Sequence, residues 1–193
     1  MVLAGYNSAM KRQPAITTRR MVLRPVRLRD EAAVRALAGS KRIADLCLWL
    51  LYERGEQSAR RFIEDCRQAW ATGRGAEFAI ELRRSGRVVG LAGLHGLDLR
   101  HDSAELGFVV NERHWGNGYA SEAAAVVLWF GFEKLKLNRI YARHLAGNAA
   151  SARVLAHIGM KREGVLREVA QKPDGFEDAV ISSILRREWE GIS

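Results

Sequence analysis

The spacing of apolar and polar residues divides the chain into segments of different period. Residues 20–26 alternate as a half-buried strand does. Residues 30–38 repeat apolar side chains at helical spacing, with Asp30 as the expected N-cap and Gly39 as the expected stop. A second amphipathic helix is predicted over residues 56–72. The apolar residues of the segment 41–55 fit either a helix or a loop over the core.

The second part of the chain alternates strands with helices. Further strands are predicted at residues 76–83, 87–94, 104–110, 139–145, 160–166 and 176–186, and further helices at residues 119–135 and 148–158. Ser85-Gly86 and Pro173-Asp174-Gly175 are typical of the turns that join strands. The resulting order, β-α-α-β-β-β-α-β-α-β-β, predicts an α/β protein (an α+β mixed sheet) with helices on the faces of the sheet. Residues 1–16 lack clear periodicity and are expected to form a flexible tail, which leaves residues 17–193 as a single domain.

The net charge narrows the range of partners. The 193 residues carry a formal net charge of +9, while a hydrophobic share of 48% is ordinary for a globular protein. Positive charge favours nucleic acid, an anionic membrane surface or an anionic small molecule. The basic residues are spread over the chain without a run of five, which argues against nucleic acid. The sequence contains neither a long apolar segment nor a signal peptide, so no membrane contact is expected and the cytoplasm is the expected compartment.

Cysteine and histidine positions give no indication of a metal site. Cys47 and Cys66 fit no metal-ligand spacing and are expected to be free thiols in a reducing compartment. The histidines are His95, His101, His114, His144 and His157, and they do not cluster along the sequence. No metal ion is therefore expected.

The candidate chemistry lies where the strand over residues 104–110 leads into the helix that starts at Tyr119. The loop between them contains Gly116 and Gly118, and the first N–H groups of a helix have no partner within it. Small residues there let an anion approach the backbone at the positive end of the helix dipole. The loop therefore predicts an anion site at residues 116–121, most naturally for a pyrophosphate.

The same loop is compatible with other structures. The two glycines alone are also compatible with a simple tight turn. A dinucleotide-binding loop would need glycine where Ser121 stands, and a Walker loop would need Gly-Lys-Ser/Thr, which does not follow.

The segment Trp115-Gly116-Asn117-Gly118-Tyr119-Ala120-Ser121-Glu122-Ala123 resembles the acetyl-CoA-binding signature of the GNAT superfamily of N-acetyltransferases. Gly118 and Ala120 fill its last two fixed places, and Trp115 stands where many members carry Gln or Arg. That form resembles the branch of ribosomal-protein alanine N-acetyltransferases. Three more segments resemble the same branch: Arg24-Pro25 with Asp30, Asn148–Ser151 followed by Gly159–Gly164, and Phe176–Asp178 leading to Arg187–Trp189.

The resemblance implies a GNAT-like acyl-CoA N-acyltransferase fold with acetyl-CoA as co-substrate. It implies that the strand before the loop splays from its neighbour, and that a substrate amine attacks the thioester directly, without a covalent enzyme intermediate. The backbone N–H of Val109 or Val110 would hold the developing oxyanion. The residues that the resemblance assigns to CoA are Phe108, Val109, Val110, Trp115, Gly116, Asn117, Gly118, Tyr119, Ala120, Asn148 and Ser151.

Two side chains near the loop are candidates for proton transfer. Glu105 begins the strand that lines the predicted cleft and is the candidate general base, either directly or through water, although a solvated carboxylate at a strand end fits equally well. Ser151 resembles the serine near the CoA sulfur in this branch, with a capping serine of the first helical turn as the alternative. Glu105 and Ser151 are therefore the predicted catalytic residues. Glu122 is expected to interact with the helix dipole, and residues 49–52 either line the acceptor cleft or belong to the core.

The branch resemblance implies an amine acceptor, with a protein or peptide N-terminus first and a small amine, amino acid or antibiotic second. It also allows for a homodimer. Two rival functions use the same residues differently. One is a basic nucleic-acid- or ribosome-associated binding protein, and the other is a CoA-binding sensor without catalysis.

Overall fold

The computed structural model of the chain describes residues 12–47, 56–172 and 175–191. Within these residues, eight strands form one mixed sheet in the order β1-β2-β3-β4-β5-β6-β8-β7. Neighbouring strands are antiparallel, except that β5 and β6 are parallel. The strands are β1 (Ile16–Thr17), β2 (Met21–Pro25), β3 (Ala76–Leu82), β4 (Val88–Asp98), β5 (Ser103–Val110), β6 (Arg139–Leu145), β7 (Lys161–Lys172) and β8 (Gly175–Leu185).

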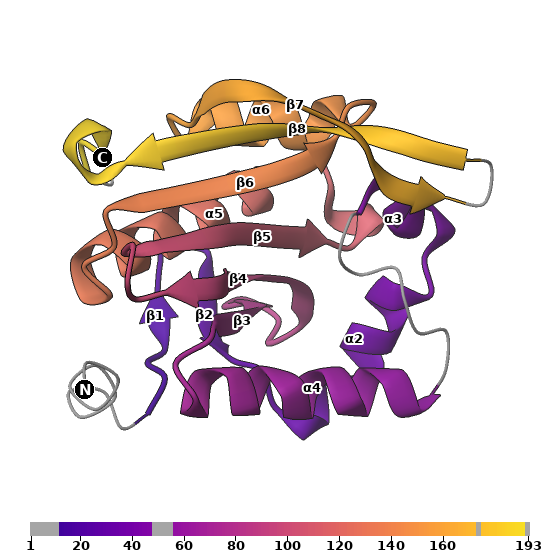
Figure 1. Cartoon of the computed structure of the whole chain (residues 1–193). Helices are drawn as coiled ribbons and strands as arrows, with labels where there is room; N and C mark the ends of the chain where they lie inside the picture. The colour runs from indigo at the N-terminus through magenta and orange to yellow at the C-terminus, as the bar shows by residue number, and fades with distance from the viewer. Residues whose placement is uncertain (1–11, 48–55, 173–174, 192–193) are drawn as a thin grey trace.

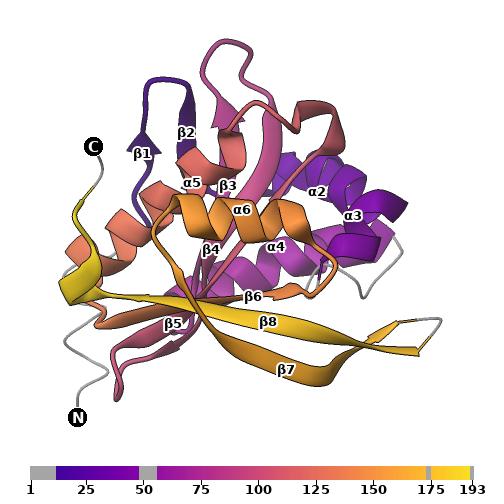
Figure 2. The same cartoon turned by 90° about the horizontal axis from the view of Figure 1, so that it is seen from above.

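Helices cover both faces of the sheet. The α-helices are α2 (Glu31–Ala38), α3 (Lys41–Leu46), α4 (Glu56–Ala71), α5 (Tyr119–Trp129) and α6 (Ala149–His157). Short 3-10 turns at Leu28–Asp30, Glu112–His114 and Arg186–Glu188 and a π-helical turn at Phe130–Lys134 complete the fold. Figure 1 shows α4 beside β3 and β4, with α5 and α6 behind the strands, and Figure 2 shows α5 and α6 next to each other on one side of the sheet. None of the described helices is long and apolar enough to cross a membrane.

The alternation of side chains along β5 divides the core into two parts. Leu106 and Val110 face α5 and belong to the larger buried cluster, which includes α5 itself. Val109 points the other way and packs with Val34 of α2 and Ile63 of α4. Helix α5 is apolar around most of its circumference, which is typical of a helix buried within a domain.

The central pair of parallel strands separates after three residues. Ser103–Glu105 of β5 pair with Arg139–Tyr141 of β6, and the register between these strands ends there. Beyond that point β5 continues along β4, whereas β6 continues along β8. The expected splay between β5 and its neighbour is therefore present.

The predicted order of elements is confirmed, apart from the additional helix α3 in the ambiguous segment 41–55, the extension of β4 to Asp98 and four further differences in detail. Strand β1 includes Ile16 of the expected tail. Its two residues pair with β2, but two residues are too few to show a periodic pattern in the sequence. The helix predicted to reach Leu135 ends as an α-helix at Trp129, and the N–H of Leu135 bonds five residues back, to Phe130 O, at 3.0 Å. Strand β7 extends through a polar stretch to Lys172 because β8 pairs with it.

The fourth difference concerns Asp30. It precedes α2 as predicted, but its side chain makes no capping bond to that helix. Its carboxylate instead accepts hydrogen bonds from the guanidinium of Arg24, at 2.7 and 2.8 Å, and from the N–H of Arg27. Arg24 and Asp30 are both 4% exposed, so they form a buried ion pair at the start of the domain. Of the predicted turns, Ser85-Gly86 joins β3 to β4, whereas Pro173 and Asp174 lie outside the described residues.

Candidate active site

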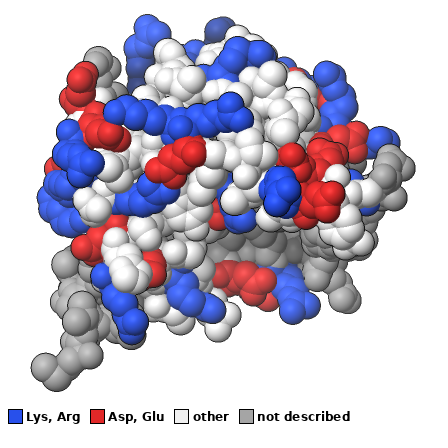
Figure 3. All heavy atoms as spheres, turned by 45° about the horizontal axis from the view of Figure 1, so that its top comes forward, with Lys and Arg blue, Asp and Glu red and all other residues white. Residues whose placement is uncertain are grey.

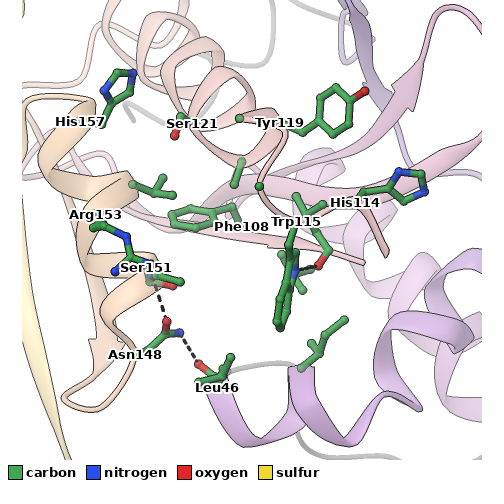
Figure 4. Close-up of a pocket in the computed structure, with 18 of the residues that line it drawn as sticks. Leu46, Phe108, His114, Trp115, Tyr119, Ser121, Asn148, Ser151, Arg153 and His157 are labelled. Atoms are coloured by element: carbon green, nitrogen blue, oxygen red, sulfur yellow. Dashed lines mark hydrogen bonds between the residues drawn. The ribbon is translucent and has the colours of Figure 1, made fainter. Parts of the chain in front are cut away.

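A cavity of about 650 Å³ lies where α3, α5, α6 and the splayed end of β5 meet. The predicted residues that line it are Phe108, Val109, Val110, Trp115, Gly116, Gly118, Tyr119, Ala120, Asn148 and Ser151. Figure 4 shows Asn148, which precedes α6, and Ser151 and Arg153 of that helix across the cavity from Trp115. Residues separated by more than 40 positions in the sequence thus contribute to one site.

The loop before α5 exposes the start of that helix to the cavity. Gly116 and Gly118 adopt φ values of +76° and +74°, and Gly118 is the N-cap of α5. Because other L-residues adopt this left-handed conformation only at a cost, the backbone at Gly118 favours glycine. The first helical bond is donated by Glu122 to Gly118 O, at 3.1 Å, so the N–H groups of the three preceding residues have no acceptor within the helix. This geometry suits an anion.

Asn117 supports the loop without lining the cavity. Its side-chain amide donates to His114 O and Trp115 O, at 3.1 and 3.0 Å. Its own carbonyl accepts from Nη1 of Arg20 at 2.8 Å, and Arg20 also pairs with Glu122 at 2.6 Å. Glu122, expected to interact with the helix dipole, is therefore held by Arg20.

The charges around the cavity suit a polyanion. Arg153, His114 and His157 line it, and none of its described lining residues is Asp or Glu. The start of α5 adds a partial positive charge. On the face that Figure 3 displays, Lys and Arg are interspersed with Asp and Glu.

Asn148 connects α6 to α3 at the edge of the cavity. Its Oδ1 accepts from the N–H of Ser151 at 3.0 Å and thereby caps α6, and its Nδ2 donates to Leu46 O at 2.9 Å. Ser151 is therefore not the capping residue of this helix. Lys172 stabilises the same end of α3 by donating to Ala44 O and Asp45 O, at 3.0 and 3.3 Å.

Trp115 forms the other connection to α3. Its indole Nε1 donates to Val110 O at 2.6 Å, which ties the loop to the end of β5. The guanidinium carbon of Arg42 lies 5.1 Å from the centre of the Trp115 ring, within the range of a cation–π contact. Helix α3 thus spans the cavity between Trp115 on one side and Asn148 on the other.

The hydrogen bonds between β4 and β5 decide which backbone groups of β5 face the gap that opens where β5 splays from β6. Asn111 donates to Val89 O, and bonded positions in an antiparallel pair occur at every second residue. Val109 therefore directs its N–H toward β4, whereas Phe108 and Val110 direct theirs toward the gap beside β6. Of the two oxyanion-binding groups expected from the sequence, only that of Val110 points into the gap.

Glu105 lies on the opposite face of the sheet from the cavity. Its side chain lies on the same face of the sheet as that of Val109. Its carboxylate accepts two hydrogen bonds from the guanidinium of Arg143 on β6, both at 2.8 Å. A smaller cavity of about 30 Å³ in the gap between β5 and β6 is lined by both Arg143 and Ser151. Ser151 also lines the larger cavity and Arg143 binds Glu105, so this small cavity has one lining residue from each side of the gap.

Sequence reasoning missed the contributions of α3 and of the rest of α6. Arg153 and His157 are four residues apart, so the period of the predicted helix could have placed these two side chains beside each other, although not beside Ser151. Ile43, Leu46 and Cys47 gave no such signal, because their segment was compatible with helix or loop. The predicted acceptor-cleft residues 49–52 lie outside the described residues.

The cysteine at the cavity is a protonated thiol near neutral pH. Burial raises the pKa of Cys47 to about 11, despite the nearby Lys172. Cys66, on α4, has its pKa raised by burial and by the carboxylates of Glu77 and Asp65. No group of three potential metal ligands occurs among the described residues.

Comparison with known proteins gives a consistent result. The sequence model described as "Acetyltransferase (GNAT) domain" matches residues 20–161. "Uncharacterized N-acetyltransferase YoaA" of Bacillus subtilis is 32% identical over 173 residues, which are 90% of this chain and 97% of that protein. "Putative ribosomal N-acetyltransferase YdaF" of the same organism is 32% identical over 147 residues, 74% of this chain and 79% of that protein.

A solved structure shares both the fold and part of the sequence. RimJ of Mycobacterium smegmatis, in complex with CoA-disulfide, superposes with a TM-score of 0.81 at 25% identity. The match covers 92% of this chain and 90% of RimJ.

Proposed function

Because this chain belongs to the GNAT family of acetyltransferases, we propose that it acetylates the N-terminal amine of a protein or peptide. The activity at the level of the family is that of an acetyl-CoA-dependent N-acetyltransferase acting on an amine. The identity of the amine, the residues that bind CoA and the residues that move protons are the content of the proposal.

The gap between β5 and β6 carries the proposal. The small cavity in this gap is lined by Ser151, which also lines the larger cavity, and by Arg143, which binds Glu105. A thioester held on the cavity side can thus meet an amine that enters from the Glu105 side. Alignment of this kind contributes several kcal/mol to catalysis.

The cavity residues fit CoA by their chemistry. The N–H groups at the start of α5, with Arg153 nearby, suit the pyrophosphate, and the backbone of Phe108 and Val110 suits the amide groups of the pantetheine arm. When bound, acetyl-CoA supplies an activated acyl group to the amine. The N–H of Val110 faces the gap and would stabilise negative charge on the acetyl oxygen. Ser151 would donate a hydrogen bond or proton to the leaving sulfur.

The proton balance favours an α-amine. The attacking nitrogen must be neutral, and an α-amine with a pKa of about 7.8 is neutral in roughly one molecule of seven at pH 7. A lysine side chain, with a pKa of about 10.4, is neutral in fewer than about one of a thousand. Glu105, reaching the amine directly or through water, would suffice as base for the former. The name of YdaF, which describes a ribosomal N-acetyltransferase, points to the same class of acceptor.

We also infer a cytoplasmic location, because the cysteines that the structure describes, Cys47 and Cys66, are free thiols.

The acceptor is tested with matched peptides and acetyl-CoA, followed by mass spectrometry. One peptide has a free α-amine and no lysine, and its partner has a blocked α-amine and one lysine. We expect acetylation of the first only. Transfer to the second alone, or only to small amines, would reject the proposed acceptor.

The proposed catalytic residues are tested in the same assay. Glu105→Gln keeps a hydrogen bond to Arg143 but cannot hold a proton as a carboxylate does, and Ser151→Ala removes only the hydroxyl. Both should reduce kcat by about 10²-fold while leaving the Kd of CoA nearly unchanged. Wild-type protein that binds CoA but acetylates no amine would favour the sensor function instead.

A further inference from the structure

A row of ionisable side chains crosses the sheet on the face opposite α5. It consists of Glu77 on β3, His95 on β4, Glu105 on β5, and Tyr141 and Arg143 on β6. His95 and Glu105 are direct partners in the β4–β5 register, and Glu105 and Tyr141 are partners in the β5–β6 register. Directly opposite residues of neighbouring strands share a face, so these side chains are adjacent.

Glu77 is a buried carboxylate that the core would not favour by itself. Its side chain is 3% exposed, and Oε2 lies 3.1 Å from Nε2 of His95. Both of its carboxylate oxygens are buried without a hydrogen-bond partner among the described residues, so the ion pair with His95 is the compensation that they have there. Burial of a charged group in this way costs several kcal/mol unless it is compensated, so a function for the group is a reasonable expectation.

The backbone leaves room for this carboxylate. Gly93 lies opposite Glu77 in the β3–β4 register, and a Cβ at Gly93 would lie 2.6 Å from Oε2 of Glu77 and 2.5 Å from Ala76 O. A side chain at this position would therefore push the carboxylate away from His95. The close approach of Glu77 to β4 depends on a glycine there.

His95 links the buried carboxylate to the accessible one. Its side chain is 36% exposed, in contrast to that of Glu77. Burial alone would lower the pKa of His95, but the charges of Glu77 and Glu105 outweigh it and hold the pKa above its ordinary value. The groups that face this site are Glu77 from β3 and Glu105 from β5. Cys66 of α4 lies near Glu77, with Asp65 next to it in the helix, and Tyr141 and Arg143 lie near Glu105.

We propose that His95, held by Glu77, receives through Glu105 the proton that the acceptor amine loses during acetyl transfer. The inference rests on the proposed function. As the nitrogen–carbon bond forms and the carbon–sulfur bond breaks, the sulfur leaves with the electron pair. The nitrogen releases its proton to the carboxylate of Glu105, which passes it to the imidazole, and the exposed edge of His95 returns it to solvent.

The chemistry favours this division of roles. A carboxyl group with a reference pKa of about 4.3 holds a proton only briefly at pH 7, whereas an imidazole with a reference pKa of about 6.5 or above holds it far longer. Glu77 stabilises the imidazolium that results, as a buried carboxylate does beside a catalytic histidine. His95 and Glu77 are positioning residues in this scheme, because they act through Glu105.

The test is the pH profile of kcat/KM with any amine that the wild type acetylates, corrected at each pH for the fraction of that amine that is neutral, so that the remaining acidic limb belongs to the enzyme. Turnover should rise with pH as His95 loses its proton. Glu77→Gln removes the charge that holds this pKa up, so the acidic limb should move to lower pH by about one unit. His95→Gln should abolish that limb and reduce kcat at pH 7 by about 10²-fold. His101→Gln, at an exposed position in the turn after β4, is the matched control and should change neither.

The outcomes separate this inference from the proposed function. NMR titration of the His95 imidazole follows its pKa without turnover, and Glu77→Gln should lower it. A shift of both the NMR pKa and the acidic limb supports the relay. A limb that stays in place while the NMR pKa moves overturns the relay but leaves the proposed function intact. If Glu77→Gln no longer binds CoA, the His95→Gln variant tests the relay in its place. An acidic limb that is retained in His95→Gln also overturns the relay. An inactive wild type would instead count against the proposed function.

Discussion

Asn148 offers the clearest test of how α3 is held over the cavity. The substitution Asn148→Ala removes two bonds at once, the cap on the N–H of Ser151 and the bond from Nδ2 to Leu46 O. Loss of an N-cap costs about 1 kcal/mol, and loss of the bond to Leu46 costs about another 1 kcal/mol because the side chain is buried. We therefore expect a loss of about 2 kcal/mol in the free energy of unfolding, or about 4–8 °C in Tm.

The two contributions are separable by a second variant. Asn148→Ser keeps an oxygen that can cap α6 but does not reach Leu46, so it should recover about 1 kcal/mol of the loss. Asn111→Ala is the matched control, because Asn111 caps only the short turn Glu112–His114 and makes no bond to α3. It should cost less than Asn148→Ala.

Urea denaturation, monitored by circular dichroism, measures all three variants, and calorimetric titration with CoA measures the effect on the site. Asn148→Ala should weaken CoA binding more than Asn148→Ser does, because α3 is released from α6. Equal losses of stability in these two variants would refute the role of the bond to Leu46. An Asn148→Ala variant as stable as the wild type would refute both bonds.

Three further predictions concern other named contacts. Burial alone would raise the pKa of Asp30, but the hydrogen bonds from Arg24 and Arg27 hold it below its ordinary value. The stabilisation that ionised Asp30 contributes is therefore complete above about pH 4 and is lost as pH falls through the lowered pKa. Asp30→Asn should lower the free energy of unfolding by about 3 kcal/mol at pH 7. In denaturation experiments below about pH 4, the difference between this variant and the wild type should shrink. Because burial raises the pKa of Cys47 to about 11, iodoacetamide should alkylate this thiol slowly at pH 8. The variant Cys47→Ala should retain turnover. Loss of its turnover with intact CoA binding would contradict direct attack of the amine on the thioester. Trp115→Phe removes the bond to Val110 O and should cost about 1 kcal/mol of stability and raise the Kd of CoA, whereas an unchanged Kd would show that the loop does not depend on that bond.

The order of the elements could be predicted because it depends on local patterns. The alternation over residues 104–110 and the helical spacing after Tyr119 involve only residues close together in the sequence. The structure has β5 and α5 at these places. Strand β1 could not be found in this way, because its two residues form a strand only by pairing with β2.

The site was predictable only in its local part. The glycine loop is a contiguous motif, so the lining of the cavity near Gly118 followed from the sequence. The bond from Asn148 to Leu46 joins residues 102 positions apart, and the pair of Arg143 with Glu105 joins residues 38 positions apart. Contacts of this kind depend on the register and splay of strands, which no local pattern specifies.

The central claim is that CoA binds at the start of α5, and the change in Tm on adding acetyl-CoA tests it most directly. At about 100 times its Kd, acetyl-CoA should stabilise the wild type by about 2.7 kcal/mol, which corresponds to a rise of about 5–11 °C. Gly118→Glu places a negative charge at the anion site, whereas Gly86→Glu makes the same change at a glycine of similar φ, +66°, in the β3–β4 turn. The account predicts that the rise disappears in Gly118→Glu and persists in Gly86→Glu. Absence of a rise in the wild type, or an equal rise in both variants, would contradict it.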